Sequence, residues 1–258
     1  MNKKIKIFQK GFNYSQDGRG NRLVFHLQGC NMKCPWCSNP EGMLLNGINI
    51  TEKGRTRLSC KEYMIEELVR ESVRSKPMFF DGGGVTLTGG EISMQFEEVK
   101  ELLKKLKEEN IHTAIETNGS HPRMEELTPY VDQWIMDVKH YDGEKHKAWV
   151  GVSLENTTKT LNNVSKTHKD MLVRVPLIPG FNDCESDAKC FAKYFVQNIN
   201  SRNKENVQVE FLVYHEFGKQ KWEQCGMEYK MPNSRLVSGT VKMFEDVMKE
   251  NKIICVRT

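Results

Sequence analysis

Apolar residues recur along the chain in short runs whose spacing switches between that of strands and that of helices. The segment 22–28, RLVFHLQ, alternates and is rich in β-branched and aromatic residues, as is typical of a strand. The segment 96–109 instead places its valine and leucines on one face at helical spacing. In the same way the sequence predicts strands at 85–88, 111–116, 133–138, 171–178 and 207–213, and helices at 61–76, 123–130, 144–168, 185–198 and 234–249.

These segments form roughly six strand-then-helix units in succession. Repeated units of this kind favour a parallel sheet, and their number and short connections predict an α/β fold, a partial (β/α)6 TIM-like barrel. We expect one domain over 1–258, since a barrel of this length need not be split. The first twenty residues, ending in the turn signature DGRG, are predicted to form a loop. The polar, glycine-containing segment 38–59 carries no predicted element.

Composition places the chain among ordinary folded proteins, with 38% hydrophobic and 28% charged residues. The net charge of +4 is mild, and lysines alternate with glutamates, as in KELLKKLKEEN, which is typical of solvated helix faces and not of a nucleic-acid interface. No apolar stretch of signal-peptide or membrane-spanning length occurs. We therefore expect a cytoplasmic protein with no membrane and no nucleic-acid partner.

The most informative stretch is CNMKCPWC at 30–37, directly after the first predicted strand. Thiolates are soft ligands that select zinc or an iron–sulfur cluster. Structural zinc sites and simple electron-transfer clusters normally use four ligands, but no convincing fourth ligand follows Cys37, because His26 lies inside the strand and Cys60 is far downstream. A four-iron cluster held by Cys30, Cys34 and Cys37 alone leaves one iron open to a substrate. A zinc or redox loop is the alternative.

Chemistry in parallel α/β barrels lies at the carboxyl ends of the strands. Polar, charged or glycine residues occupy such positions within or just after the predicted strands, namely Cys30, Gly90, Glu91, Thr117, Asn118, Asp137, Lys139, Arg174 and His215. The remaining cysteines lack ligand spacing, and most are expected to be buried free thiols.

With the motifs CNMKCPWC, TGGE, ETNG, MDVK and VYHEFGKQKW, the chain resembles the radical S-adenosylmethionine (SAM) superfamily. Within it, DGRGNR, GGGVTLTGGE and YHEFGKQKW are similar to the activating enzymes of glycyl radical enzymes, of the pyruvate formate-lyase type. The resemblance runs from DGRG to GMEYK near residue 230. Many such enzymes insert a ferredoxin-like segment with further cysteines after the first motif. Here 38–81 contains only Cys60, so the resemblance implies the compact type without that insertion.

The resemblance implies that Cys30, Cys34 and Cys37 hold a [4Fe-4S] cluster whose fourth iron is chelated by the amino and carboxylate groups of SAM. Trp36 and Ser38 are expected to lie against the cofactor, with Trp36 near the adenine, although Trp36 also suits a packing role. The other implied cofactor-binding residues are Gly89, Gly90 and Glu91 at the methionyl ammonium, and Asp137, Val138, Lys139 and His215 at the ribose and carboxylate side.

Three of these assignments have alternatives or extensions. Outside this family context, Lys139 would more often be solvated and His215 would more often be a packing histidine. Arg174, set among apolar residues, requires a carboxylate partner, either that of the cofactor or Glu116. Some family members bind a monovalent cation, and the matching positions are Glu116, Thr117 and Asp137, with Glu116 standing where Asp is usual.

The implied reaction begins with one-electron reduction of the cluster by a flavodoxin or ferredoxin. Cleavage of SAM then gives a 5′-deoxyadenosyl radical that abstracts hydrogen from a backbone glycine of a partner glycyl radical enzyme. Contact with that partner is expected at DGRG and at 215–221, unless both are simply ordered loops. The alternatives are a radical SAM enzyme acting on a small molecule or peptide, and a non-catalytic iron–sulfur or zinc electron carrier.

Overall fold

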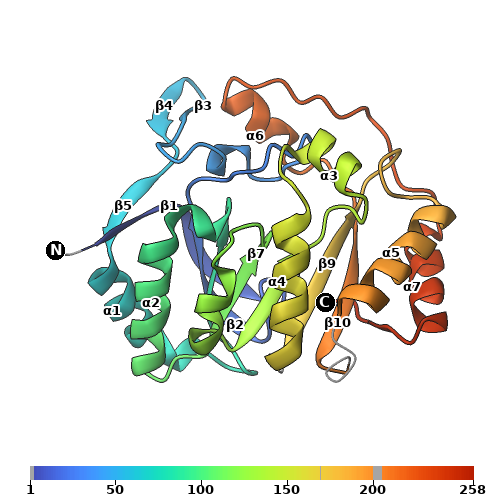
Figure 1. The fold of residues 1–258 in the computed structure, drawn as a ribbon. Coiled ribbons are helices and arrows are strands. Elements are labelled where there is room, and N and C mark those ends of the chain that lie inside the picture. The colour runs from blue at the N-terminus through green and yellow to red at the C-terminus, as the bar shows by residue number, and fades with distance from the viewer. Residues whose placement is uncertain (1–2, 169, 200–204) are drawn as a thin grey trace. The chain divides into compact units, whose positions relative to one another are not determined.

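The structure of the chain, a computed structural model, describes residues 3–168, 170–199 and 205–258 (Figure 1). Its internal contacts divide the chain into two units. The first unit comprises Met1–Thr117, Leu127–Gln133 and Phe217–Lys230. The second comprises Asn118–Glu126, Trp134–Glu216 and Met231–Thr258.

The first unit contains a mixed sheet in the order β7, β6, β2, β1, β5. The central strands β2, β6 and β7 are parallel, whereas β1 is antiparallel to both of its neighbours. The bounds are β1 Lys4–Tyr14, β2 Asn21–Leu27, β5 Lys61–Met64, β6 Gly84–Gly89 and β7 Thr113–Thr117. Leu87 of β6 and Phe25 of β2 are fully buried, as expected of parallel strands covered on both faces.

Helices and a small hairpin complete the first unit. The helices are α1 Ile65–Arg74, α2 Phe96–Glu108 and α6 Lys219–Gln224, with short 3-10 turns at η1 Pro40–Gly42, η2 Lys76–Met78 and η3 Ile92–Gln95. The hairpin pairs β3 (Asn49–Glu52) with β4 (Arg55–Leu58) in a separate two-stranded sheet. Val99, Leu102, Leu103 and Leu106 of α2 are fully buried, which confirms the helical face predicted for this segment.

The second unit contains four parallel strands in the order β11, β10, β9, β8. They are β8 Gln133–Asp137, β9 Met171–Leu177, β10 Val207–Val213 and β11 Ile254–Cys255. The helices are α3 Gly143–Val150, α4 Glu155–Thr167, α5 Glu185–Asn198 and α7 Thr240–Glu250. The 3-10 segment η4, Met124–Tyr130, is divided between the two units. Aromatic rings fill this core, with Phe211 and Phe244 at 5.0 Å and Phe191 and Phe195 at 5.9 Å between ring centroids.

The α/β class and the successive parallel strands are confirmed, three in the first unit and three more, before β11, in the second. The predicted loop over the first twenty residues is wrong, because β1 runs through Lys4–Tyr14 and buries Ile5 and Ile7. The start of the helix predicted at 61–76 is also wrong, since 61–64 form β5 against Lys4–Ile7. The last helix begins at Thr240 and not at residue 234. The β3–β4 hairpin and α6 were not predicted.

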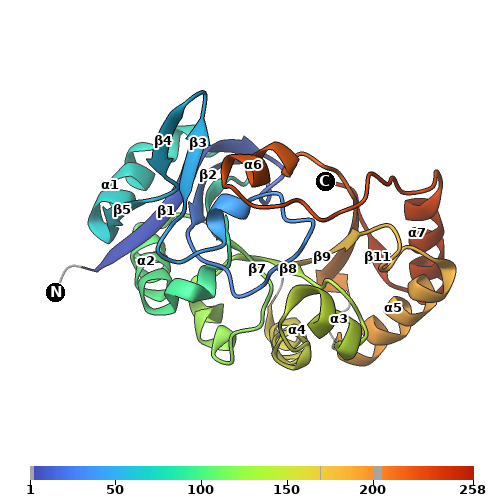
Figure 2. The same cartoon turned by 90° about the horizontal axis from the view of Figure 1, so that it is seen from above.

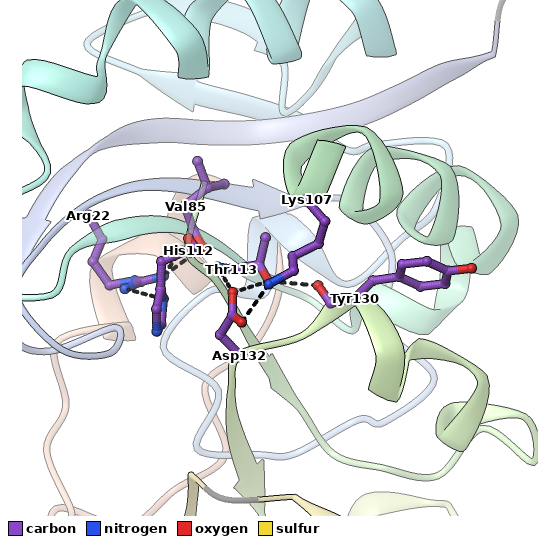
Figure 3. A network of polar contacts seen from close by, with 7 residues as sticks. All are labelled: Arg22, Val85, Lys107, His112, Thr113, Tyr130 and Asp132. Carbon is purple, nitrogen blue, oxygen red and sulfur yellow. Dashed lines mark hydrogen bonds and ion pairs between the residues drawn. The ribbon is translucent and has the colours of Figure 1, made fainter. Parts of the chain in front are cut away.

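A polar network fixes the amino ends of the first unit's strands (Figure 3). Arg22 is fully buried at the start of β2, where its guanidinium donates to the Thr86 hydroxyl at 2.6 Å and to the Val85 carbonyl at 2.8 Å. Asp132 accepts from Lys107 Nζ at 2.6 Å and from the Thr113 amide at 2.9 Å. The amino ends of these strands thus have a structural role, and functional residues are expected at the opposite, carboxyl ends, where the cysteine loop begins.

Candidate functional site

The cysteine loop begins directly after β2 and is anchored by Gln28. This glutamine is fully buried, and its side-chain amide donates to the carbonyls of Glu41 at 2.8 Å and Leu44 at 2.7 Å. The Cys30 amide donates to the Met43 carbonyl at 2.9 Å. The segment 41–44 therefore fixes the position at which the loop leaves the sheet.

Backbone amides donate hydrogen bonds to two of the three cysteine sulfurs. The Met32 amide lies 3.4 Å from Cys30 Sγ, and the Asn39 amide lies 3.4 Å from Cys37 Sγ. Such donors favour the thiolate form of a cysteine. Burial nevertheless raises the pKa of Cys30, and the charges of Glu91, Cys34 and Cys37 raise it further. The Cys30 thiolate is therefore favoured beside positive charge, which a metal centre supplies.

The chemistry of the donor set fits a [4Fe-4S] cluster, because thiolates are soft ligands. Among residues 3–168, 170–199 and 205–258, no three Cys, His, Asp or Glu side chains converge on one position for a metal ion. In a four-iron cluster each thiolate binds a different iron, so the sulfurs need not converge. Cys30, Cys34 and Cys37, which form no disulfide, thus suit a [4Fe-4S] cluster as three separate soft donors.

The Gly89-Gly90-Glu91 turn lies directly against the residues that precede Cys30. The Gly90 amide donates to the Leu27 carbonyl at 2.9 Å and the Glu91 amide to the Gly29 carbonyl at 2.7 Å. A Cβ atom at Gly90 would lie 2.2 Å from the Gly29 carbonyl oxygen. The structure therefore brings this predicted cofactor segment and the cysteine loop together, and only glycine permits the approach.

Glu91 connects the turn to the end of β7. Its carboxylate is 1% exposed, and Oε1 accepts from the Ser93 amide at 3.0 Å, the Ser93 hydroxyl at 2.7 Å and the Thr117 hydroxyl at 2.7 Å. The neighbouring Glu116 accepts from the Thr88 hydroxyl at 2.6 Å. Both first-unit residues of the predicted cation site are therefore hydrogen-bonded within the protein: Glu116 accepts from Thr88, and Thr117 donates to Glu91.

Segment 217–230, from late in the chain, supports the cysteine loop. The Trp222 indole donates to the Cys37 carbonyl at 2.9 Å, and Lys221 Nζ contacts both Glu41 Oε1 and Asn39 Oδ1 at 2.8 Å. A Cβ at Gly218 would lie 2.6 Å from the Cys37 carbonyl oxygen. From the sequence, 215–221 was predicted only as a partner contact or an ordered loop. The family motif GKQKW, which contains Gly218, Lys221 and Trp222, was the feature of the sequence that could have indicated this supporting role.

Trp36 and Ser38 belong to this first-unit loop as well. Trp36 is 8% exposed, and Ser38 is partly exposed beside Gly218. These positions suit packing as well as cofactor contact, so the roles predicted for both residues stay predictions.

The second unit holds the remaining predicted residues. Lys139 Nζ lies 2.9 Å from Asp137 Oδ2, with both side chains largely buried, and Val138 between them is fully buried. Arg174 Nε lies 2.9 Å from Glu210 Oε2, at side-chain exposures of 7% and 5%. Glu210, which sequence reasoning did not name, therefore supplies a carboxylate to Arg174. His215 lies two residues beyond the end of β10 and is exposed.

The family model described as the radical SAM superfamily matches residues 24–189, which include the cysteine loop and the glycine-rich turn. The chain belongs to the radical SAM superfamily. Members of this superfamily use a [4Fe-4S] cluster together with SAM, in agreement with the cofactors predicted from the sequence.

Named relatives extend the match over most of the chain. The pyruvate formate-lyase-activating enzyme of Clostridium pasteurianum is 34% identical over 83% of this chain and 84% of its own length. The pyruvate formate-lyase 1-activating enzyme of Escherichia coli (strain K12) is 33% identical over 83% and 82%. The 4-hydroxyphenylacetate decarboxylase activating enzyme of Clostridioides difficile (strain 630) is 28% identical over 93% and 91%.

Solved structures confirm the radical SAM fold. A domain of pyruvate-formate lyase-activating enzyme from Bacteroides vulgatus matches with a TM-score of 0.54 at 21% identity, over 68% of this chain and 98% of that one. A radical SAM methyltransferase from Sphaerobacter thermophilus matches with a TM-score of 0.63 at 15% identity, over 95% and 67%. Within the described residues, no helix combines the length and apolarity needed to cross a membrane.

Proposed function

We propose that this radical SAM chain activates a glycyl radical enzyme. The observation that carries the proposal is the similarity, at 33–34% identity over 83% of the chain, to activating enzymes of pyruvate formate-lyase. The local geometry supports the proposal, because the Gly89-Gly90-Glu91 turn is hydrogen-bonded to the residues directly before the cysteine loop.

The cluster and SAM supply the chemistry when bound: one electron from the reduced cluster cleaves the C5′–S bond to methionine and a 5′-deoxyadenosyl radical, which takes hydrogen from a glycine Cα of the partner. The chain itself binds and orients. Cys30, Cys34 and Cys37 would hold three of the irons, and Trp222 and Lys221 keep the end of their loop in place. Gly89 and Gly90 let backbone reach the ammonium of SAM.

The remaining predicted residues complete the proposed site. Asp137, Val138, Lys139 and His215 would hold the ribose and carboxylate side of SAM, and Arg174 would face its carboxylate. Trp36 and Ser38 would lie against the cofactor, with Trp36 near the adenine. The contact of Asp137 with Lys139 supports this assignment, because it gathers at the end of β8 a carboxylate that can accept from ribose hydroxyls and an ammonium that can donate to a carboxylate. A monovalent cation at Glu116, Thr117 and Asp137 is part of the same proposal.

The partners follow from this function. We propose a pyruvate formate-lyase-like protein as the substrate and a flavodoxin or ferredoxin as the electron donor. A cytoplasmic location suits these partners and a thiolate-bound cluster, which requires reducing conditions. We also propose one catalytic domain without a ferredoxin-like insertion, because 38–81 contains only Cys60.

Anaerobic reconstitution with iron and sulfide tests the catalytic step. The wild-type chain should gain an iron–sulfur chromophore and, with dithionite, convert SAM to 5′-deoxyadenosine. Cys34→Ala should lose both iron and turnover, because two thiolates do not hold the cluster, whereas Cys190→Ala, which removes an exposed thiol on α5, should keep both. An intact cluster without SAM cleavage would contradict the catalytic proposal and favour an electron carrier.

Electron paramagnetic resonance tests the substrate class. Incubation of the reduced chain and SAM with a pyruvate formate-lyase should give a glycyl radical doublet. SAM cleavage that proceeds without any glycyl radical would instead favour a small-molecule or peptide substrate.

A further inference from the structure

The β3–β4 hairpin and the start of β5 carry an exposed basic face, composed of Lys53, Arg55, Arg57 and Lys61. Figures 1 and 2 show the hairpin beside β5 and β1 in the first unit. Within the described residues, none of these four cations has an ion-pair or side-chain hydrogen-bond partner. We refer to them as the basic hairpin face.

Several exposed lysines on the helices instead meet a glutamate one turn away, as in Lys159–Glu155 at 2.7 Å and Lys189–Glu185 at 2.6 Å. The basic hairpin face differs from these surfaces in gathering within nine residues four cations that have no such partner in the described part of the chain. Of the two acids in 49–63, Glu62 is paired with Lys4 at 3.3 Å, which leaves Glu52. The basic hairpin face therefore carries a net positive charge, four cations against the carboxylate of Glu52 on the strand opposite Arg55, and attracts an acidic surface.

A cavity of about 510 Å³ lies between the hairpin and β1. Its lining combines the cations Arg57, Lys61 and Lys10 with the apolar or aromatic side chains of Phe8, Leu58 and Tyr63. Leu58 is 51% exposed, and Lys10 lies 4.6 Å from the centroid of the Tyr63 ring. Apolar contact area inside a charged rim is the composition of protein interfaces that form and dissociate.

The base of the hairpin is bonded to the support of the cysteine loop. Ser59 donates its hydroxyl to Gln28 Oε1 at 3.3 Å and its amide to the Ile48 carbonyl at 2.8 Å. Gln28 is the residue that fixes segment 41–44 and hence the start of the cysteine loop. A protein docked on the basic hairpin face would therefore contact an element tied to the cluster ligands.

We infer that the basic hairpin face is the docking surface for an acidic one-electron carrier protein that reduces the cluster. The inference rests on the proposed function, which requires one electron from outside for each SAM cleaved. In the docked complex the carrier is oxidised and the cluster reduced by one electron, with no proton or bond exchanged. A second copy of this chain is a poor occupant, since two basic faces repel.

Charge reversal tests the surface without touching the cofactor residues. In Arg55→Glu/Arg57→Glu two exposed cations of β4 become acids, and Lys193→Glu, a single exposed charge reversal on α5 in the second unit, is the control for a change elsewhere on the surface. Production of 5′-deoxyadenosine is measured with a reduced acidic flavodoxin and, separately, with dithionite. We expect the flavodoxin-driven rate of the double variant to fall about tenfold or more at low salt. The dithionite-driven rate and the Lys193→Glu rates should equal those of the wild type.

Salt dependence is the second readout. The difference in flavodoxin-driven rate between the double variant and the wild type should shrink at about 0.5 M NaCl, where exposed charges are screened within a few ångströms.

An unchanged flavodoxin-driven rate in the double variant would overturn the inference. An equal loss of rate with dithionite would also overturn it, because the hairpin would then have only a structural role. Weakened binding of a glycyl radical enzyme with an unchanged flavodoxin rate would assign the face to that partner instead. A wild-type chain inactive with dithionite would instead refute the proposed function, and the docking inference would fall with it.

Discussion

Two glycines set the distance between the cofactor turn and the cysteine loop. Gly89 has φ = +123°, a conformation that strains other residues, and a Cβ there would lie 2.3 Å from the Leu27 amide nitrogen. At Gly90 the obstacle is the Gly29 carbonyl oxygen at 2.2 Å. Both obstacles are backbone atoms, so no side chain can rotate away to make room.

Gly90→Ala should therefore displace the residue next to Cys30. We expect the iron content after reconstitution to fall several-fold and the free energy of unfolding to fall by about 1–3 kcal/mol, as for other overpacked positions. Iron analysis and urea unfolding measure the two effects. Gly11→Ala is the matched control, because no atom lies within 4 Å of its added Cβ and its φ is not positive. Wild-type iron content in Gly90→Ala would show that the turn does not constrain the loop.

At the scale of elements, the amino ends of the first unit's strands contain a buried charge network (Figure 3). His112, directly before β7, lies with Nδ1 3.3 Å from the Arg22 guanidinium. Burial, and then the charge of Arg22, lowers the pKa of His112 to about 4. The folded chain therefore keeps this imidazole neutral, whereas the unfolded chain protonates it near pH 6.5.

This difference predicts a loss of stability on acidification. Between about pH 6.5 and 4 the unfolded chain binds the additional proton, so the free energy of unfolding decreases as the pH falls through this window. The full effect is at most about 3 kcal/mol and smaller after solvent screening. His112→Gln, which cannot titrate, should reduce the difference between urea unfolding at pH 7 and at pH 4.5. A pH dependence equal to that of the wild type would show that His112 does not contribute.

For the molecule as a whole, the predicted cofactor residues are distributed over both units. The cysteine loop, the glycine-rich turn and Thr117 belong to the first, and Asp137, Lys139, Arg174 and His215 to the second. Because SAM binds the folded chain and not the unfolded one, its binding should be visible in the free energy of unfolding and not only in turnover.

Ligand linkage gives the size of this effect. SAM at a hundredfold excess over its Kd should stabilise the reconstituted chain by about 2.7 kcal/mol and raise its Tm accordingly. Anaerobic thermal unfolding with and without SAM measures the shift. In Cys34→Ala the shift should be absent, because the open iron that chelates SAM is lost, while Cys190→Ala should retain it. An equal shift in Cys34→Ala would show that SAM binds without the cluster.

The sequence by itself determined the features that depend on neighbouring residues. Apolar periodicity located α2, α5 and β10 because each buries its own regularly spaced face. The spacing of Cys30, Cys34 and Cys37 indicated an open iron because ligand number is a property of the loop itself. The family motifs added the predicted cofactor segment Gly89-Gly90-Glu91, which is hydrogen-bonded to the residues directly before this loop in the structure.

Only the tertiary structure decided the features that join residues far apart in the chain. Four-residue β5 is too short for a periodic signal and exists because it pairs with Lys4–Ile7. Glu210 meets Arg174 across neighbouring strands, and Trp222 reaches the Cys37 carbonyl from 185 residues away. Local sequence does not encode such partners, since each contact depends on the register of other elements.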